Sequence, residues 1–206
     1  MPKRTDSSAM QRRQIAAEAA RIMATEGQLL YLTAKQKAAD RLGVKQRQTL
    51  PSNAEVAAEL KSYLQVFGGR EREQAVHDQL KTAIEAMTWL QDFEPKLSGA
   101  LAEGLANVHT PIKLHLFSDD PDAPLRHLLD RNFPYQQEQK SIRWHNDQHR
   151  TIECLSFQAG DWRVELWLFD RHDQRQAPPS PIDGKAQRRL SVAAVEALLQ
   201  EQRQRL

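Results

Sequence analysis

Cysteine is almost absent from this sequence. The chain of 206 residues contains one, Cys154, so no disulfide can form within it. Folds that depend on a disulfide framework are thereby excluded, and we expect a reducing, cytoplasmic location. Cys154 lies in a stretch of alternating apolar residues, which favours a small core residue over a reactive nucleophile.

Long apolar runs are also missing. Hydrophobic residues make up 40% of the chain, and its mean hydropathy is −0.68. No stretch approaches the roughly 20 apolar residues that a membrane helix needs, so we expect no membrane partner. The first residues, MPKRTDSSAMQRRQ, are basic but precede no apolar run, and the sequence therefore predicts no secretory signal.

The chain has no large excess of positive or negative charge, since its formal net charge is +2. The charged residues are, however, unevenly distributed along the sequence. Residues 1–50 carry ten lysines and arginines against four acidic residues, residues 51–170 twelve against nineteen, and residues 171–206 seven against four. Basic ends of this kind can bind nucleic acid through its phosphates. They can also serve solubility alone, with residues 1–9 as a disordered tail. Both interpretations stay open.

The first part of the chain has the apolar period of α-helices. We expect one helix in the basic N-terminal segment, a second over about 30–42, a third after Ser52 and a fourth over about 70–92. Ser52 and Glu55 have the S-x-x-E spacing of a capping box, which marks the start of the third helix. Residues 1–94 are therefore predicted to form a helical N-terminal region.

After this region the pattern changes to short apolar runs. Alternation predicts strands at 111–117, 141–145, 151–157 and 162–169, followed by a final helix over about 190–203. Helices followed by strands of this kind favour an α+β fold. We expect residues 95–206 to form a small domain with a mixed or antiparallel sheet, flanking helices and a C-terminal helix.

One segment of this second domain contains a motif. Residues 98–117 read SGALAEGLANVHTPIKLHLF, in which Gly99 and Gly104 precede an alternating strand. The segment resembles the opening motif of the DNA polymerase beta-like nucleotidyltransferase superfamily, where a glycine–serine turn and a second glycine lead to a strand bearing two aspartates. The resemblance covers about residues 96–170. It implies a nucleotidyltransferase-like fold, with Glu165 at the position of the family's third carboxylate.

The metal-binding residues of that superfamily are changed in this chain. Pro111 and Lys113 stand where the resemblance places the two aspartates, and Ala100 stands where it places the serine. Nucleotidyl transfer in the family uses two magnesium ions held by carboxylates, which Glu165 alone cannot bind. We therefore expect a catalytically degenerate member without metal or cofactor, which retains nucleotide or phosphate binding or a regulatory role.

The ligand-binding residues that we expect lie around the former metal cleft. Lys113, His115 and Arg163 would make this cleft positive, and a positive cleft can hold phosphate without a metal. The prediction requires that strands 112–117 and 162–169 share one sheet, with Lys113 and Glu165 on the same face. The complete set of candidate ligand-binding residues is Gly99, Gly104, Lys113, His115, Arg163 and Glu165.

Other interpretations of the same residues stay open. Lys113 can form an ion pair with Glu165 and bind no ligand. The chain can also be a nucleic-acid-binding or protein-interaction module that uses its basic termini and has no nucleotide pocket. A helix-turn-helix is disfavoured because the loop over 44–51 is too long for its turn. His145 and His149 would suit zinc only on a helix, and we expect them in a loop, so no metal site is predicted.

Overall fold

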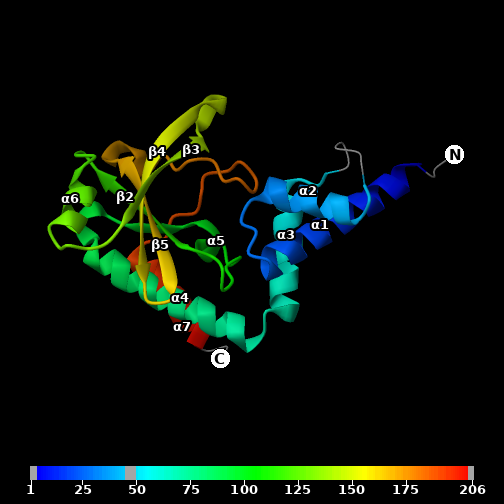
Figure 1. The fold of residues 1–206 in the computed structure, drawn as a ribbon, viewed down its shortest axis with the longest axis horizontal. Helices are drawn as coiled ribbons and strands as arrows, with labels where there is room; N and C mark the ends of the chain where they lie inside the picture. Colours follow the sequence, from blue (N-terminus) through cyan, green and yellow to red (C-terminus); the bar gives the residue numbers. More distant parts are fainter. Residues whose placement is uncertain (1–3, 45–49, 204–206) are drawn as a thin grey trace. The chain divides into compact units, whose positions relative to one another are not determined.

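The computed structural model describes residues 4–44 and 50–203 and divides into two compact units. The first unit comprises Met1–Glu71 with Pro181–Asp183, and the second comprises Arg72–Ser180 with Gly184–Leu206. The architecture is α+β, as the sequence predicts: N-terminal helices are followed by a five-stranded mixed sheet with flanking helices (Figure 1). No helix in the described part of the chain is both long and apolar enough to cross a membrane.

The first unit is built from α1 (Arg4–Thr25), α2 (Tyr31–Arg41) and α3 (Asn53–Phe67). Its interior consists of small and aliphatic side chains at helical spacing, among them Ile15, Ala19, Ile22, Ala34, Ala38, Val56 and Leu60. The predicted capping box is confirmed: the Ser52 hydroxyl accepts from the Glu55 backbone, and the Glu55 carboxylate accepts from the Ser52 backbone. This reciprocal pair satisfies two backbone donors at the start of α3.

The sequence predictions for residues 1–9 and for the loop over 44–51 fall partly outside the described residues. Residues 1–9 were expected to be disordered, but α1 begins at Arg4, while residues 1–3 lie outside the described part. The loop that argues against a helix-turn-helix includes residues 45–49, which also lie outside it.

Helix α4 (Gly69–Trp89) marks the junction between the units. Its buried stripe, which includes Val76, Leu80, Ala83 and Met87, belongs to the core of the sheet. The compact units therefore divide after Glu71, whereas the sequence places the boundary at residue 94, where helices give way to strands. Periodicity reveals that a segment is helical, but it does not reveal which partner its apolar stripe packs against.

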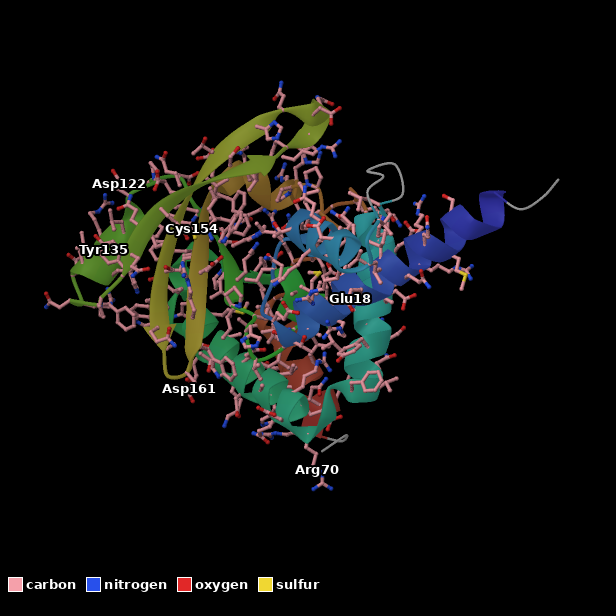
Figure 2. The ribbon with its side chains drawn as sticks, turned by 45° about the vertical axis from the view of Figure 1, so that its right-hand side comes forward. Glu18, Arg70, Asp122, Tyr135, Cys154 and Asp161 are labelled. Carbon is pink, nitrogen blue, oxygen red and sulfur yellow. The ribbon has the colours of Figure 1, made fainter. Side chains whose placement is uncertain are left out.

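The sheet consists of β1 (Lys96–Ser98), β2 (Ile112–Ser118), β3 (Gln136–Arg143), β4 (His149–Ala159) and β5 (Trp162–Asp170). Its strand order is β1-β2-β5-β4-β3, in which β2 and β5 run parallel and the other neighbours are antiparallel. The β4–β5 hairpin turns through Gly160, whose positive φ of 59° suits glycine. Figure 2 shows Asp161 at the tip of this hairpin and Cys154 within the sheet.

Short elements connect these strands. They are η2 (Gln91–Phe93), α5 (Gly99–Ala102), α6 (Ala123–Leu129), η3 (His145–Asp147) and η4 (Arg171–Arg175), and the final helix is α7 (Val192–Arg203). The predicted strands and the final helix are present with shifted ends. Strand β1 and helix α5 were not predicted, because three and four residues are too few to establish a period.

The two faces of the sheet differ in chemistry. The apolar face carries Leu97, Ile112, Leu114, Leu116, Leu155, Phe157, Val164 and Leu166 and packs with α4, α5, α6 and α7. The opposite face, which we call the charged face, carries the alternate residues, among them the polar and charged side chains Lys96, Lys113, His115, Glu138, Lys140, Ser156, Arg163 and Glu165. It also carries a smaller buried cluster of Phe117, Ile152, Cys154, Trp167 and Phe169. Figure 1 shows α4 and α7 together on one side of the sheet.

Candidate functional site

The parallel pairing of β2 with β5 places the two principal candidate residues side by side. Lys113 and Glu165 are direct partners in the register, as are His115 and Trp167. Partners in a ladder project from the same face, so Lys113 and Glu165 share the charged face. The structure thus agrees with the expectation that their strands lie in one sheet with both side chains on one face.

Glu165 is the most heavily engaged side chain on the charged face. Its carboxylate lies 3.2 Å from Lys140 Nζ and 3.7 Å from Arg163 Nε, and it accepts a hydrogen bond of 3.1 Å from Trp167 Nε1. Burial opposes its ionisation, but the Trp167 bond and the charges of Lys140 and Lys113 outweigh burial, so the pKa of Glu165 is lowered. Glu165 is therefore an anion that organises cations around it.

Lys113 has a different environment from Lys140. Its ammonium lies 3.9 Å from the centroid of the Trp167 ring, and no carboxylate oxygen among the described residues lies within 4 Å of it. Burial lowers the pKa of Lys113, partly offset by the charge of Glu165. The direct Lys113–Glu165 ion pair that the sequence allows is therefore not formed, and the ring face of Trp167 is the contact that stabilises this ammonium.

Two further residues complete the charged cluster. Arg163 Nη2 lies 3.3 Å from Glu138 and donates to the Ser156 hydroxyl at 3.2 Å. Lys140 also lies 3.0 Å from Glu138, and hydrogen bonds to both carboxylates raise its pKa against the effect of burial. We call Lys113, Lys140, Arg163, Glu138, Glu165 and Trp167 the Trp167 cluster. It contains three cations and two carboxylates.

The two candidate glycines occupy different places. Gly99 has a φ of 74° and lies against the Lys113 side chain, since a Cβ at this position would lie 3.5 Å from Lys113 Cβ and Cδ. Gly99 is therefore a neighbour of the Lys113 stem. A Cβ on Gly104 would meet nothing within 4 Å, and its carbonyl accepts from Arg72 at 3.1 Å. The structure thus does not bring Gly104 to the Trp167 cluster.

His115 lies on the charged face but is fully buried. Its Nδ1 accepts a hydrogen bond of 3.0 Å from Arg189 Nε, and its ring lies beside Phe169. Burial, with the charges of Arg189 and Lys113, holds the pKa of His115 well below its ordinary value. His115 therefore stays neutral, and it belongs with Arg189 rather than with the Trp167 cluster.

Sequence reasoning missed Lys140 and the role of Trp167. Lys140 lies near the middle of β3, at the end of the sequence QQEQK, which has no apolar alternation that would predict a strand. Trp167 is 9% exposed and lies on the charged face. The usable signal was its place two residues after Glu165, because residues i and i+2 of a strand share a face.

The cysteine and the histidines provide no further chemistry. Cys154 is buried, and burial raises the pKa of its thiol to about 12, which removes the reactive thiolate at neutral pH. Among the described residues, Asp170, His172 and Asp173 form the one group close enough to bind a metal. Arg150 already pairs with both carboxylates at 2.6 Å. His145 bonds the Ala177 carbonyl, and neither His145 nor His149 belongs to that group.

Comparison with known proteins finds no matching family, no matching curated relative and no matching solved structure. Arguments about function therefore depend on the residues of this chain and their geometry.

Proposed function

We propose that the charged face binds the phosphate group of a nucleotide or a similar ligand, in a nucleotidyltransferase-like domain without metal-dependent catalysis. The observation that carries this proposal is the position of Lys113. Its ammonium lies over Trp167 with no carboxylate oxygen within 4 Å among the described residues, so its charge is available to an anion. A half-buried ammonium gains more from a phosphate than an exposed one, because water screens it less.

The neighbours of Lys113 support an anionic ligand. Three cations of the Trp167 cluster face two carboxylates. Glu165 already accepts hydrogen bonds from Lys140 and Trp167 and forms an ion pair with Arg163 at 3.7 Å. These bonds hold Lys140 and Arg163 in place before a ligand arrives, which lowers the entropy lost on binding.

The surroundings of Trp167 favour recognition of the phosphate group of a nucleotide over recognition of its base. Its ring is covered by Lys113 at 3.9 Å and by Lys140 at 5.4 Å, and little of the residue is exposed. A nucleobase could stack on this ring only after displacing both ammonium groups. The cluster therefore suits the charged part of a nucleotide, and we expect weak discrimination between bases.

The residues also argue against magnesium-dependent transfer. Glu165 is the one carboxylate that the resemblance places in the metal cleft, and Lys113 holds a positive charge beside it. A cation in this cleft would be repelled by Lys113, and Pro111 offers no side-chain ligand. We propose that binding, and through it regulation, is the function that remains.

A nucleic-acid-binding module that uses the basic termini is the second candidate. The basic N-terminal segment is partly neutralised in the structure: Arg12 pairs with Glu55, and Arg41 pairs with Glu18 and Glu26. These pairs reduce the positive charge that the segment offers to a phosphate backbone. The Trp167 cluster is therefore the better supported site.

Thermal unfolding of the full chain with ATP, with and without magnesium, tests the proposal. A ligand that binds only the folded state raises the melting temperature. We expect a saturable rise for the wild type that does not require magnesium. Lys113→Gln should remove most of it, whereas Lys81→Gln, which neutralises an exposed lysine on α4, should leave it unchanged.

Two results would contradict the proposal. One is a wild type that no nucleotide stabilises. The other is a Lys113→Gln variant that responds to ATP as the wild type does. Binding to RNA that weakens steeply with salt and survives Lys113→Gln would instead support the nucleic-acid module.

A further inference from the structure

A second group of cations lies on the charged face, around Arg189 and apart from the Trp167 cluster. Arg189 donates from Nε to His115 Nδ1 and from Nη1 to the Asp173 carbonyl at 2.7 Å. Its guanidinium carbon lies 4.8 Å from the centroid of Phe117 and 5.2 Å from that of Phe169. These contacts fix the guanidinium in one position.

No carboxylate among the described residues forms an ion pair with Arg189. Burial lowers its pKa to about 10, partly offset by the charge of Asp173, so the group stays protonated at neutral pH. A half-buried cation without a counter-ion is costly for a folded protein, and such a charge is usually paired.

Hydrogen-bond donors in this region also exceed acceptors. Arg189 Nη2 and Gln174 Nε2 are buried and have no partner among the described residues. Because His115 Nδ1 accepts from Arg189, the proton of the neutral ring is on Nε2, and this third buried donor also lacks a partner. Each buried donor without a partner destabilises the fold. Buried donors of this kind are usually satisfied, so an acceptor is expected near these three groups.

A cavity of about 330 Å³ adjoins two of these residues, Arg189 and Gln174. Its lining includes Lys96, Gln174, Arg189 and Ser191. Lys96 is the partner of His115 in the β1–β2 register and has no carboxylate within 4 Å among the described residues. Ser191 directly precedes α7, so the positive end of that helix dipole also lies at the cavity.

We propose that this cavity binds an oxyanion, either a phosphate or a carboxylate, free or carried by a small molecule. The oxyanion would supply the acceptors that Arg189 and Gln174 lack, and it would neutralise the charges of Arg189 and Lys96. Binding here does not depend on the Trp167 cluster, because neither Lys113 nor Lys140 lines the cavity.

Nuclear magnetic resonance of the full chain titrated with inorganic phosphate, and separately with acetate, tests this site. Ionic strength is kept constant with chloride. The backbone amides of Ser191 and Ala194, both at the cavity, should shift saturably. Lys96→Gln and Gln174→Leu should each weaken binding about tenfold or more, the usual effect of losing a hydrogen bond to a charged group.

Matched variants separate this site from the Trp167 cluster. Lys81→Gln and Lys113→Gln should leave the shifts of Ser191 and Ala194 unchanged. Gln174→Leu removes a buried donor without a partner, so the free protein should keep its stability, which makes its loss of binding interpretable.

Weaker binding in either cavity variant supports the site and identifies a group that binds. The inference is overturned if neither anion shifts these amides. It is also overturned if Lys96→Gln and Gln174→Leu both titrate as Lys81→Gln does.

Discussion

The two faces of the sheet are built from the same strands but are stabilised by different interactions. On the apolar face, Leu114, Leu155 and Leu166 are completely buried against aliphatic and aromatic side chains. On the charged face, Glu165 and His115 are also buried, but Glu165 depends on hydrogen bonds and ion pairs and His115 on a hydrogen bond from Arg189. The first face stabilises the fold through the area it removes from water, and the second positions charge.

This difference indicates where function lies. The charged face also buries apolar side chains, among them Phe117, Ile152 and Phe169, and their burial stabilises the fold. Buried charges contribute little net stability. Beside these apolar side chains lie Lys113 of the charged face and Arg189, which packs against it, two cations without carboxylate partners among the described residues. Both are positioned by aromatic rings, and both proposals start from this shared feature.

The largest effect is expected from truncation on the apolar face. Leu166→Ala should lower the free energy of unfolding by about 2–5 kcal/mol, because it leaves a cavity among fully buried residues. Urea unfolding followed by circular dichroism measures the loss. Leu129→Ala is the control, since Leu129 is 50% exposed and should change little. If Leu166→Ala lowers the free energy of unfolding no more than Leu129→Ala does, the apolar face does not stabilise the fold as proposed.

Removal of the central carboxylate should have a smaller effect. Glu165→Gln weakens the bonds to Lys140, Arg163 and Trp167, and we expect a loss of about 1–3 kcal/mol at neutral pH. Glu196→Gln, on an exposed carboxylate of α7, provides the matched control. Equal stability of the two variants in urea would show that Glu165 does not organise the cluster.

The same residue predicts a pH dependence. The pKa of Glu165 is lower in the folded protein than its ordinary value of 4.5, so its ionised form stabilises the fold above that value. This contribution should be lost as the pH falls from about 4.5 through the lower folded pKa. The wild type should therefore lose its stability advantage over Glu165→Gln in acid. A difference that stays constant from neutral to acid pH would contradict this account.

Lys113 should affect binding far more than stability. Lys113→Met loses the contact with Trp167 but no longer buries an ammonium, so we expect a change within about 1 kcal/mol. Its melting temperature should be close to that of the wild type, whereas most of the stabilisation by ATP should be lost. A severely destabilised Lys113→Met protein would assign Lys113 a structural role instead.

The smallest effect concerns Cys154. Because burial raises its thiol pKa to about 12, the native protein should react with thiol reagents very slowly at neutral pH. Mass spectrometry should find modification only after unfolding. Fast labelling of the native protein would show that the charged face opens in solution.

The helices and main strands could be predicted because their apolar periods are long. The capping box at Ser52 and the alternation of β2 and β5 were sufficient to locate their elements and to place Lys113 and Glu165 on one face. Strand β1 was too short to predict, and it contributes Lys96 to the cavity beside Arg189.

The candidate site could be predicted only in part, for a physical reason. Sequence alternation shows that Lys113 and Glu165 share a face, but not which cation reaches the carboxylate. The structure gives that position to Lys140, from the polar half of β3, and leaves Lys113 over Trp167. Arg189 follows an irregular proline-containing segment, which has no period to relate it to the sheet.

The indole N–H of Trp167 offers the most direct test of the central claim, that the charged face binds a phosphate-bearing ligand without metal. This proton bonds Glu165, while Trp89 packs against the core on the apolar face and serves as an internal control. In a titration with ATP and a chelator, nuclear magnetic resonance should show a saturable shift of the Trp167 indole and none of Trp89. Lys113→Gln should abolish that shift. An unmoved Trp167 signal, or one that moves only with magnesium, would contradict the account.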